Sequence, residues 1–317
     1  MIVRWSLADL RPTLEELRLG RPFVIASERW RALDLPHVAW WSEVPSARAE
    51  PPDEADCILA VGGGSAIDTG KYASARTGKP VVHVPTTYSG AEWTTFYGIR
   101  SPDRVMQGGG AGALPVAIVY DVDLTLELPP DVTAGTALNA LAHCAEALYV
   151  NGHTPEADEQ ALLGATLIAH ALPRVLTVPQ DREARDDLLH GAAHAGRALG
   201  LAGLALAHAI AQALGGTYGL PHGAMNALSL PPALRFNARV VPRAVEAFGR
   251  AIGAEEDPAG RIEELARLGG FQRLRDFGVP EDGLPAVAAL AAGRMGNRRN
   301  PRVATAEEIE AMLRSVY

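Results

Sequence analysis

The stretch CILAVGGGSAIDTGK, residues 57–71, decides the fold that the sequence predicts. It begins with a short, continuously apolar run, passes through three glycines and a serine, and ends in a helical pattern. A buried strand, a tight turn and a helix in this order are typical of α/β proteins with a parallel sheet. Because Gly62, Gly63 and Gly64 let a ligand approach the backbone and the next helix presents free N–H groups, the turn favours a bound phosphate.

The turn also has an interpretation without a ligand. It matches neither GxGxxG nor GxxxxGK[ST], the two common phosphate-binding patterns, and the Ser65 hydroxyl could simply cap the helix. A second loop, HVPTTYSGAEWT at residues 83–94, again follows an apolar run and offers Thr86, Thr87 and Ser89. Open α/β sheets bind ligands at the carboxyl ends of their strands, so the two loops together favour a nucleotide over two ordinary turns.

The chain as a whole divides into two parts. The first alternates short apolar runs with turn residues, whereas the second repeats apolar residues three and four positions apart, as helices do. We therefore expect a nucleotide-binding α/β domain over residues 1–126 and a helical domain over residues 127–317. The expected strands are 22–26, 38–41, 57–61, 81–85 and 116–120. The expected helices are 131–150, 155–172, 183–200, 202–214, 221–236, 242–252, 258–268 and 305–315, separated by breakers that include Pro173, Pro179, Gly215-Gly216 and Pro231-Pro232.

Composition excludes several classes of protein. The 317 residues are 48% apolar and 21% charged, which is the balance of a globular enzyme and not of a disordered chain. A formal charge of -8 gives no basic surface for nucleic acid or anionic lipid. No segment reaches the roughly 18 consecutive apolar residues of a membrane helix, and the start lacks a signal-peptide pattern. We therefore expect a cytoplasmic protein whose two cysteines are buried thiols.

The helical part contributes a set of histidines. In TALNALAHCAEALY, Asn139 and His143 are four residues apart and share one face of a helix. His208 follows in LALAHAIAQALGG, and His222 in GLPHG. Imidazoles on facing helices can bind one divalent metal, whose fourth ligand is normally a carboxylate and here is an amide. The alternative is that these are core or pocket histidines without a metal.

Four motifs together carry a family resemblance. GGGSAIDTGK, PTTYSGAEWT, NALAHCAEALY and HAIAQALGGTYGLPHG, in this order, resemble the iron-containing (group III) alcohol dehydrogenase superfamily. The likeness covers most of the chain from about residue 56 and includes the closing NPRVATAEEIEAML. Within the superfamily the closer likeness is to the maleylacetate reductases, which also read NALAHCxEA where metal-dependent members carry Asp. The resemblance implies a dehydroquinate synthase-like fold, with a parallel-sheet nucleotide-binding domain, a helical domain and the active site between them.

The resemblance also implies a cofactor, NAD(H) or NADP(H), and the residues that hold it. In the family an acidic residue after the first strand meets the adenosine ribose, and Glu28 in VIASERW is the nearest counterpart here. A solvated loop carboxylate is an equally good interpretation of Glu28. The positions that match the family's pyrophosphate and nucleotide contacts are Gly62, Gly63, Gly64, Ser65, Thr86, Thr87 and Ser89.

The metal positions of the family match Asn139, His143, His208 and His222. With Asn139 in place of the carboxylate, the site lacks its only anionic ligand, which weakens the binding of a divalent cation such as Zn or Fe. Without a metal, we expect the three histidines to act as hydrogen-bond donors or proton relays. Asn139 is then expected to orient a substrate oxygen.

Three departures from the family pattern stand out. Gln212 lies one turn after His208, where related enzymes often carry a further histidine. The lysine common after the PTT loop has no equivalent, and Arg104 is the nearest cation; Arg104 and Arg302 are our candidates for binding a dicarboxylate. Only 61 residues precede the triple glycine, and the shortfall lies between VIASERW and ADCILAV. We therefore expect a helix or two of the nucleotide-binding half to be missing.

These features lead to three hypotheses about function. The first is an NAD(P)H-dependent reductase that transfers a hydride to an oxo-dicarboxylate or enone of the maleylacetate type. The second is a metal-dependent alcohol or aldehyde dehydrogenase. The third is a non-redox lyase, isomerase or cyclase, or a binding protein, on the same fold with a degenerate cofactor domain. A small molecule is the expected ligand in each case, and a homodimer is the expected assembly.

Overall fold

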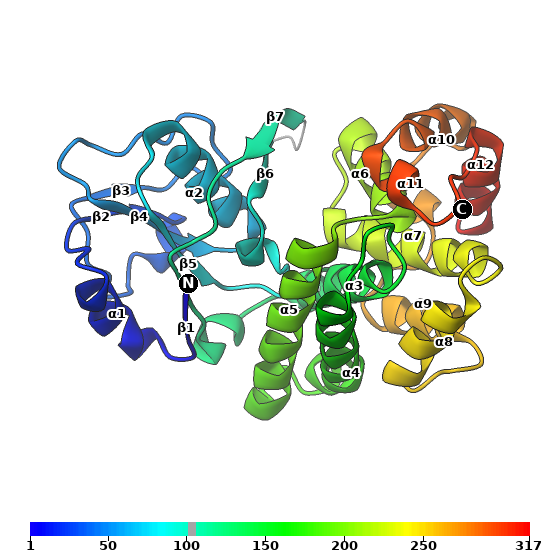
Figure 1. The fold of residues 1–317 in the computed structure, drawn as a ribbon, viewed down its shortest axis with the longest axis horizontal. Helices are drawn as coiled ribbons and strands as arrows, with labels where there is room; N and C mark the ends of the chain where they lie inside the picture. Colours follow the sequence, from blue (N-terminus) through cyan, green and yellow to red (C-terminus); the bar gives the residue numbers. More distant parts are fainter. Residues whose placement is uncertain (101–105) are drawn as a thin grey trace. The chain divides into compact units, whose positions relative to one another are not determined.

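The computed structural model describes residues 1–100 and 106–317, so Arg104 lies outside the described residues. The chain forms two compact units, Met1–Glu127 and Leu128–Tyr317 (Figure 1). The first unit is built on strands with a few helices, and the second is helical throughout its described elements. The predicted fold class, an α/β part followed by an all-α part, is confirmed.

A six-stranded parallel sheet forms the first unit, in the order β1-β8-β5-β4-β2-β3. All five predicted strands are present, and β1 at the edge of the sheet is an additional one that is too short to show a sequence pattern. The strands are β1 (Ile2–Arg4), β2 (Pro22–Ile25), β3 (Ala39–Trp41), β4 (Cys57–Gly62), β5 (Val81–Pro85) and β8 (Ala117–Val119). Five parallel pairings join all six strands, and parallel sheets of this kind are typically built from continuously apolar strands.

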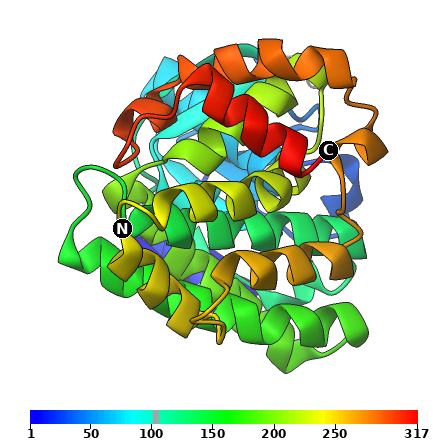
Figure 2. The ribbon, with the colours of Figure 1, turned by 90° about the vertical axis from the view of Figure 1, so that its right-hand side faces the viewer.

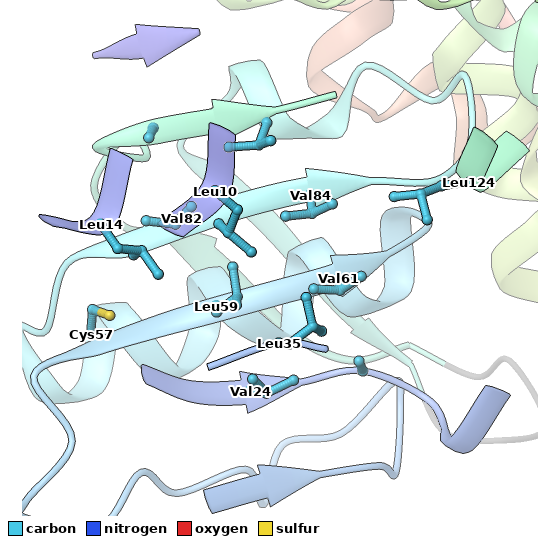
Figure 3. Packing of buried hydrophobic residues seen from close by; sticks show 13 residues of the cluster. Leu10, Leu14, Val24, Leu35, Cys57, Leu59, Val61, Val82, Val84 and Leu124 are labelled. Atoms are coloured by element: carbon cyan, nitrogen blue, oxygen red, sulfur yellow. The ribbon is translucent and has the colours of Figure 1, made fainter. Parts of the chain in front are cut away.

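Alternate residues of the central strands face two separate apolar clusters. Leu59 and Val61 of β4 pack with the side chains of α1 (Leu10–Glu16) on one face of the sheet, as Figure 3 shows. Ile58 of β4 packs on the other face with Ala73 of α2 (Gly64–Thr77). This period of two along β4 buries both faces of the sheet and holds the end of the strand, where the glycines lie, in a fixed position.

The segment between β2 and β4, residues 26–56, contains no α-helix. Its only regular elements are the 3-10 helix η2 (Glu28–Trp30) and the edge strand β3. Crossovers between parallel strands usually contain a helix that covers the sheet. Here Trp30 and Trp40 pack on one apolar cluster and Trp41 on the other. The expected loss of helices in this segment is therefore seen, and large indole side chains bury the apolar surface that a helix would cover.

The glycine run at residues 108–112, which carries no strand signal, is mostly part of a hairpin. Strands β6 (Phe96–Arg100) and β7 (Met106–Ala111) pair in the antiparallel sense. A Cβ at Gly110 would lie 2.7 Å from the Tyr97 hydroxyl oxygen, so close packing of the tyrosine ring accounts for one of the glycines. The remaining short elements of the unit are the 3-10 helices η1 (Leu7–Asp9), η3 (Ala91–Trp93) and η4 (Val122–Thr125).

Ten α-helices of the described chain make up the second unit, which is turned toward the viewer in Figure 2. The long helix α3 packs against α4, α5 and α7. The elements are α3 (Pro130–Ala147), α4 (Pro155–Thr177), α5 (Arg182–Ala202), α6 (Leu206–Tyr218), α7 (His222–Asn237), α8 (Pro242–Ala251), α9 (Pro258–Leu268), α10 (Leu284–Ala292), α11 (Met295–Arg299) and α12 (Ala306–Ser315), of which α11 is a single short turn, with 3-10 helices η5 (Leu274–Phe277) and η6 (Glu281–Gly283).

Several predicted helix breakers are wrong. Pro173 lies inside α4, the Gly215-Gly216 pair lies inside α6, and Pro231-Pro232 lies inside α7, whereas Pro179 does separate α4 from α5. A proline inside a helix loses one backbone hydrogen bond. Both prolines of α7 are buried where the helix packs against α3, α6 and α9, and this packing offsets the loss.

No single helix of the described residues is long and apolar enough to cross a bilayer. Only α5 and α6 taken together meet the criteria of length and composition, and the chain bends by 100° between them.

Candidate active site

The glycine turn lies at the carboxyl end of β4. Gly62 has a φ of +147°, and a Cβ there would lie 2.8 Å from the Cβ of Ala66. Helix α2 begins at Gly64, and Gly63 is its N-cap, with no side chain accepting a hydrogen bond from the first turn. The alternative that Ser65 caps the helix is therefore wrong, because Ser65 lies inside the first turn and is exposed. An uncapped helix start after a strand is a favourable site for a phosphate.

The two predicted loops meet at this turn. The backbone N–H of Thr86 donates to the carbonyl of Gly62 at 3.0 Å. A Cβ at Gly63 would lie 2.9 Å from the Cγ2 of Thr87, and one at Gly64 would lie 3.7 Å from the Oγ of Ser89. The Thr87 hydroxyl is buried, and no described group shares a hydrogen bond with it.

These observations define the cradle, the turn Gly62–Gly64 with Thr87 and Ser89. Its backbone comes close to neighbouring side chains, its helix end carries unsatisfied N–H groups, and it contains an unused buried hydroxyl. The pyrophosphate of a nicotinamide dinucleotide needs such groups. The residues of the cradle therefore fit NAD(H) or NADP(H).

Glu28 lies in η2, which follows β2, and β2 is the strand next to β4. Its carboxylate accepts a hydrogen bond from the Arg31 Nε at 3.2 Å. A hydrogen bond from Ser42 and the pairing with Arg31 lower the pKa of this exposed carboxyl. Glu28 is thus charged at neutral pH and lies after the carboxyl end of the strand next to β4, the edge at which open α/β sheets bind ligands.

Lys71, to which the sequence assigned no role, ties the two loops together. Its ammonium group is buried and donates to the Ala91 carbonyl at 2.6 Å, the Thr94 hydroxyl at 3.0 Å and the Phe96 carbonyl at 3.0 Å. Burial lowers the pKa of Lys71, and the carboxyl groups of Asp68 and Glu92 only partly offset this. One cation on α2 therefore holds the end of the second loop and the start of the strand that follows it.

The second unit brings the predicted histidines together. His143 lies on α3, His208 on α6 and His222 at the start of α7. The rings of His143 and His208 are stacked, with centroids 4.7 Å apart, and those of His208 and His222 are 5.7 Å apart. Asn139 lies one turn before His143 and is buried with it. Three helices thus converge on one polar cluster in an otherwise apolar interior.

Asn226, which the sequence analysis missed, lies at the centre of this cluster. Its side-chain N–H groups donate to the Asn139 Oδ1 at 2.7 Å and to the His222 Nε2 at 3.0 Å. The Nε2 of His208 is 3.3 Å from the same Asn139 oxygen, and the Asn139 amide donates to His143 Nε2 at 3.5 Å. A spacing of four residues from His222 on one helix was the available signal for Asn226.

Glu146 is the second residue that the sequence analysis missed. It is fully buried and accepts hydrogen bonds from the backbone N–H groups of Ala205, at 2.7 Å, and His208, at 3.1 Å. Its carboxylate also accepts from the His208 Nδ1 at 2.8 Å. One carboxylate therefore caps the start of α6 and fixes the orientation of the His208 ring.

The electrostatics of the cluster favour a neutral His143. Burial lowers the pKa of His143 well below its usual value, and the neighbouring His208 and His222 lower it further. A neutral imidazole has one donor and one acceptor nitrogen. His143 can therefore accept the hydrogen bond from Asn139 in the geometry observed.

Comparisons with known proteins place the chain. The family model described as iron-containing alcohol dehydrogenase matches residues 46–122, and that of the C-terminal part of the family matches residues 133–317. The maleylacetate reductase of Pseudomonas knackmussii is 36% identical over 331 residues, which cover 98% of this chain and 93% of that protein. The chain belongs to the iron-containing alcohol dehydrogenase family.

Other members of this family give a consistent result. The maleylacetate reductase of Sphingobium indicum is 40% identical over 82% of this chain and 73% of that protein. The crystal structure of maleylacetate reductase from a Rhizobium species has a TM-score of 0.90 and 28% identity, covering 100% of this chain and 95% of that one. Proteins of the family are oxidoreductases, and this chain is one of them.

The family is named for iron, and the side chains at the four metal positions decide whether this chain fits such a metal. The four family positions hold three imidazoles and an amide, and the Asn139 oxygen and the His222 Nε2 already accept hydrogen bonds from Asn226. Among the described residues, no three His, Cys, Asp or Glu side chains are arranged as metal ligands. A donor set that lacks a carboxylate and is internally hydrogen-bonded offers little to offset the dehydration of a divalent cation. These residues do not fit the family's metal.

Two arginines, Arg104 and Arg302, were expected to bind a dicarboxylate substrate. Arg302 stacks on the Phe236 ring at 3.8 Å and pairs with Glu308 at 2.8 Å. Its charge is therefore already compensated within the protein. Arg104, as stated above, is not among the described residues.

Proposed function

We propose that this protein is an NAD(P)H-dependent reductase that transfers a hydride to the conjugated double bond of an oxo-dicarboxylate of the maleylacetate type. The observation that carries the proposal is the Asn139 cluster, in which an amide replaces the carboxylate of a metal site within a family of oxidoreductases. Relatives at 36% and 40% identity are named maleylacetate reductases. Both facts favour a reduction that needs no metal.

The cofactor belongs to the first unit in this proposal, and the substrate to the second. The amides of Gly62, Gly63, Gly64 and Ser65 would bind the pyrophosphate at the uncapped start of α2. Thr86, Thr87 and Ser89 would line the same nucleotide, and Glu28 would meet the ribose. Bound NADH or NADPH supplies the hydride, and the residues 1–126 and 127–317 serve as nucleotide-binding and substrate domains.

The chemistry required of the second unit is stabilisation of an enolate. When a hydride adds to the β-carbon of an enone, the electron pair of the double bond moves toward the carbonyl oxygen. Hydrogen-bond donors fixed in advance stabilise such a charge. We assign this role to His143, His208 and His222, with Asn139 orienting the oxygen. Glu146 keeps the His208 ring in place, and a proton from one of these imidazoles completes the product.

The experiment is a set of initial rates with the purified protein. Loss of NADH or NADPH absorbance is followed on addition of maleylacetate, with a chelator in one arm and added zinc or iron in another. We expect oxidation of the reduced cofactor that is unchanged by the chelator. Activity that requires metal, with near-stoichiometric metal lost in His208→Ala, would instead establish the metal-dependent dehydrogenase. Absence of NADH and NADPH binding in a titration would favour the non-redox alternatives.

Assembly and location are part of the same proposal. We infer a homodimer, because two-fold dimers are by far the commonest oligomers of soluble enzymes. We also infer a cytoplasmic enzyme, since NAD(P)H is its proposed reductant. Light scattering on the purified protein and fractionation of the producing cells test these two statements.

A further inference from the structure

Arg294 is a half-buried arginine of the second unit. Two other half-buried arginines of this unit are Arg174, which forms an ion pair with a carboxylate, and Arg299, which donates to two backbone carbonyls. The Arg294 side chain instead lies along α6. Its Nη1 is 3.4 Å from the Gln212 side-chain oxygen, and its Nη2 donates to the Gln212 carbonyl at 3.2 Å.

The guanidinium group of Arg294 has no counter-ion in the described part of the chain. Its Nε is buried and shares no hydrogen bond with any described group. Burial lowers the pKa of Arg294, and no acidic side chain offsets the effect. A half-buried cation with an unsatisfied N–H is costly to a protein. An anionic ligand would remove this cost, and a carboxylate matches the fork of a guanidinium best.

Arg294 lies beside α6, the helix that carries His208 of the histidine cluster. Gln212 is four residues after His208 on α6, so both side chains lie on one face of the helix, about 6 Å apart along its axis. A Cβ at Gly216, one turn further, would lie 3.6 Å from the Arg294 Nη2. Helices α10 and α11, which flank Arg294, both pack against α6 (Figure 1). The guanidinium therefore lies along the face of α6 that carries His208, one to two turns beyond it.

We propose that Arg294 binds a carboxylate group of the substrate and so selects acidic substrates. Gln212, which stands where related enzymes often carry a histidine, acts as a positioning residue that holds the guanidinium through its side chain and its carbonyl. The assignment rests on the proposed function, because it places the reacting carbonyl at the histidine cluster. It also supplies the cation that Arg302 cannot, since Arg302 is paired with Glu308.

The first test is kinetic and uses Arg294→Gln, Arg294→Lys and the control Arg298→Gln. Arg298 is exposed, lies in the same short segment and loses the same charge. We expect Arg294→Gln to raise the KM for maleylacetate about 10- to 100-fold, with the KM for NADH changed less than about twofold. Arg294→Lys should keep the charge but lose the forked donor geometry of the guanidinium. Its KM for maleylacetate should therefore lie between those of the wild type and Arg294→Gln. An unchanged KM for maleylacetate in Arg294→Gln overturns the assignment.

The second test separates this inference from the proposed function. Calorimetry measures binding of adipate, a dicarboxylate that cannot be reduced, and of hexanoate, its monocarboxylate counterpart. We expect the wild-type protein to bind adipate more tightly than hexanoate, and Arg294→Gln to lose that preference. If maleylacetate is not reduced but the preference depends on Arg294, the proposed reaction fails and the carboxylate site stands. Equal preference in wild type and variant overturns the site, even if maleylacetate is reduced.

A rescue experiment distinguishes the loss of direct binding by Arg294 from a folding defect of the variant. Arg294→Ala removes the side chain, and millimolar guanidinium ion added to the assay can occupy the space and restore the charge. We expect recovery of at least about tenfold in kcat/KM for maleylacetate, with no effect on Arg298→Ala. Lack of recovery in a variant with wild-type circular dichroism counts against direct binding by Arg294.

Discussion

The cradle of the first unit consists mainly of backbone groups, whereas the histidine cluster of the second consists of side chains that hydrogen-bond to one another. In the cradle, the start of α2 is uncapped and the Thr87 hydroxyl is buried without a hydrogen bond among the described residues. In the cluster, Asn139, Asn226 and the three imidazoles hydrogen-bond to one another, while the His143 Nδ1 and the Asn226 Oδ1 are buried without a partner among the described residues. The difference favours our proposal that the backbone N–H groups of the cradle bind a charged ligand, whereas the side chains of the cluster are already held in place by one another.

The largest expected effect comes from filling the cradle with Gly63→Val. A Cβ at this position would lie 2.9 Å from the Thr87 Cγ2, and the added methyl groups would displace a bound pyrophosphate. We expect the Kd for NADH to rise about 100-fold, because several hydrogen bonds to a charged group are lost. Fluorescence titration of NADH measures this. Gly20→Ala is the matched control, since a Cβ at Gly20 meets no atom within 4 Å; equal Kd values for the two variants would remove the cradle from the cofactor site.

Removing the buried ammonium group of Lys71 tests how much the stability of the first unit depends on this cation. In Lys71→Met, the carbonyl groups of Ala91 and Phe96 and the Thr94 hydroxyl lose a charged donor. We expect the free energy of unfolding to fall by about 2–3 kcal/mol in urea titrations. Lys79→Met is the control at the only other lysine, which is only partly buried, and it should cost less than about 1 kcal/mol. A stable Lys71→Met variant would show that the loops do not depend on this cation.

Asn139→Asp adds a negative charge to the histidine cluster and so tests whether the amide is what weakens metal binding there. The carboxylate restores the negative charge that the cluster of three histidines and an amide lacks. We expect zinc to bind at least about tenfold more tightly than to the wild-type protein, as measured by calorimetry. Asn226→Asp, which adds the same charge at the amide that donates to Asn139, tests whether position matters. Equal zinc affinity in wild type and Asn139→Asp would mean that the amide is not what weakens the metal site.

The smallest effect is a pH dependence of stability from His83 in the first unit. His83 is fully buried, and burial, with a smaller effect of Lys71, lowers its pKa from 6.5 to about 3. The unfolded chain therefore binds a proton that the folded chain refuses, and stability is lost as the pH falls from 6.5 toward 3. We expect His83→Gln to flatten this slope in urea titrations at a series of pH values. An unchanged slope would assign the acid sensitivity to other groups.

Local sequence patterns predicted most elements but not the atypical ones. The strands at residues 57–61 and 81–85 have strong apolar runs between turn residues, and both are seen within one residue of the prediction. Strand β7 was missed because its glycines carry no strand signal, and it is held by pairing with β6. The breaks predicted at Pro173 and Pro231-Pro232 failed because buried helices tolerate proline where packing compensates.

The residues of the candidate site also fall into those that local patterns predicted and those that they did not. Spacing on one helix placed Asn139 beside His143, and the motifs named the cradle glycines. Glu146 was missed because its partner His208 is 62 residues away in the chain. Asn226 was missed although its spacing of four from His222 was visible, because its hydrogen bond to Asn139 spans 87 residues. The same holds for Arg294, whose partner Gln212 is 82 residues distant.

The sequence by itself determined most strands and helices, the position of the glycine turn after β4 and the family that the chain resembles, because these depend on neighbours a few positions apart. Only the tertiary structure decided that Asn226 joins Asn139 to His222, that Lys71 ties the two loops and that Arg294 has no carboxylate partner within the described residues. The physical reason is that hydrogen bonds and charge compensation are short-range interactions in space, and only folding brings distant parts of the chain within their reach.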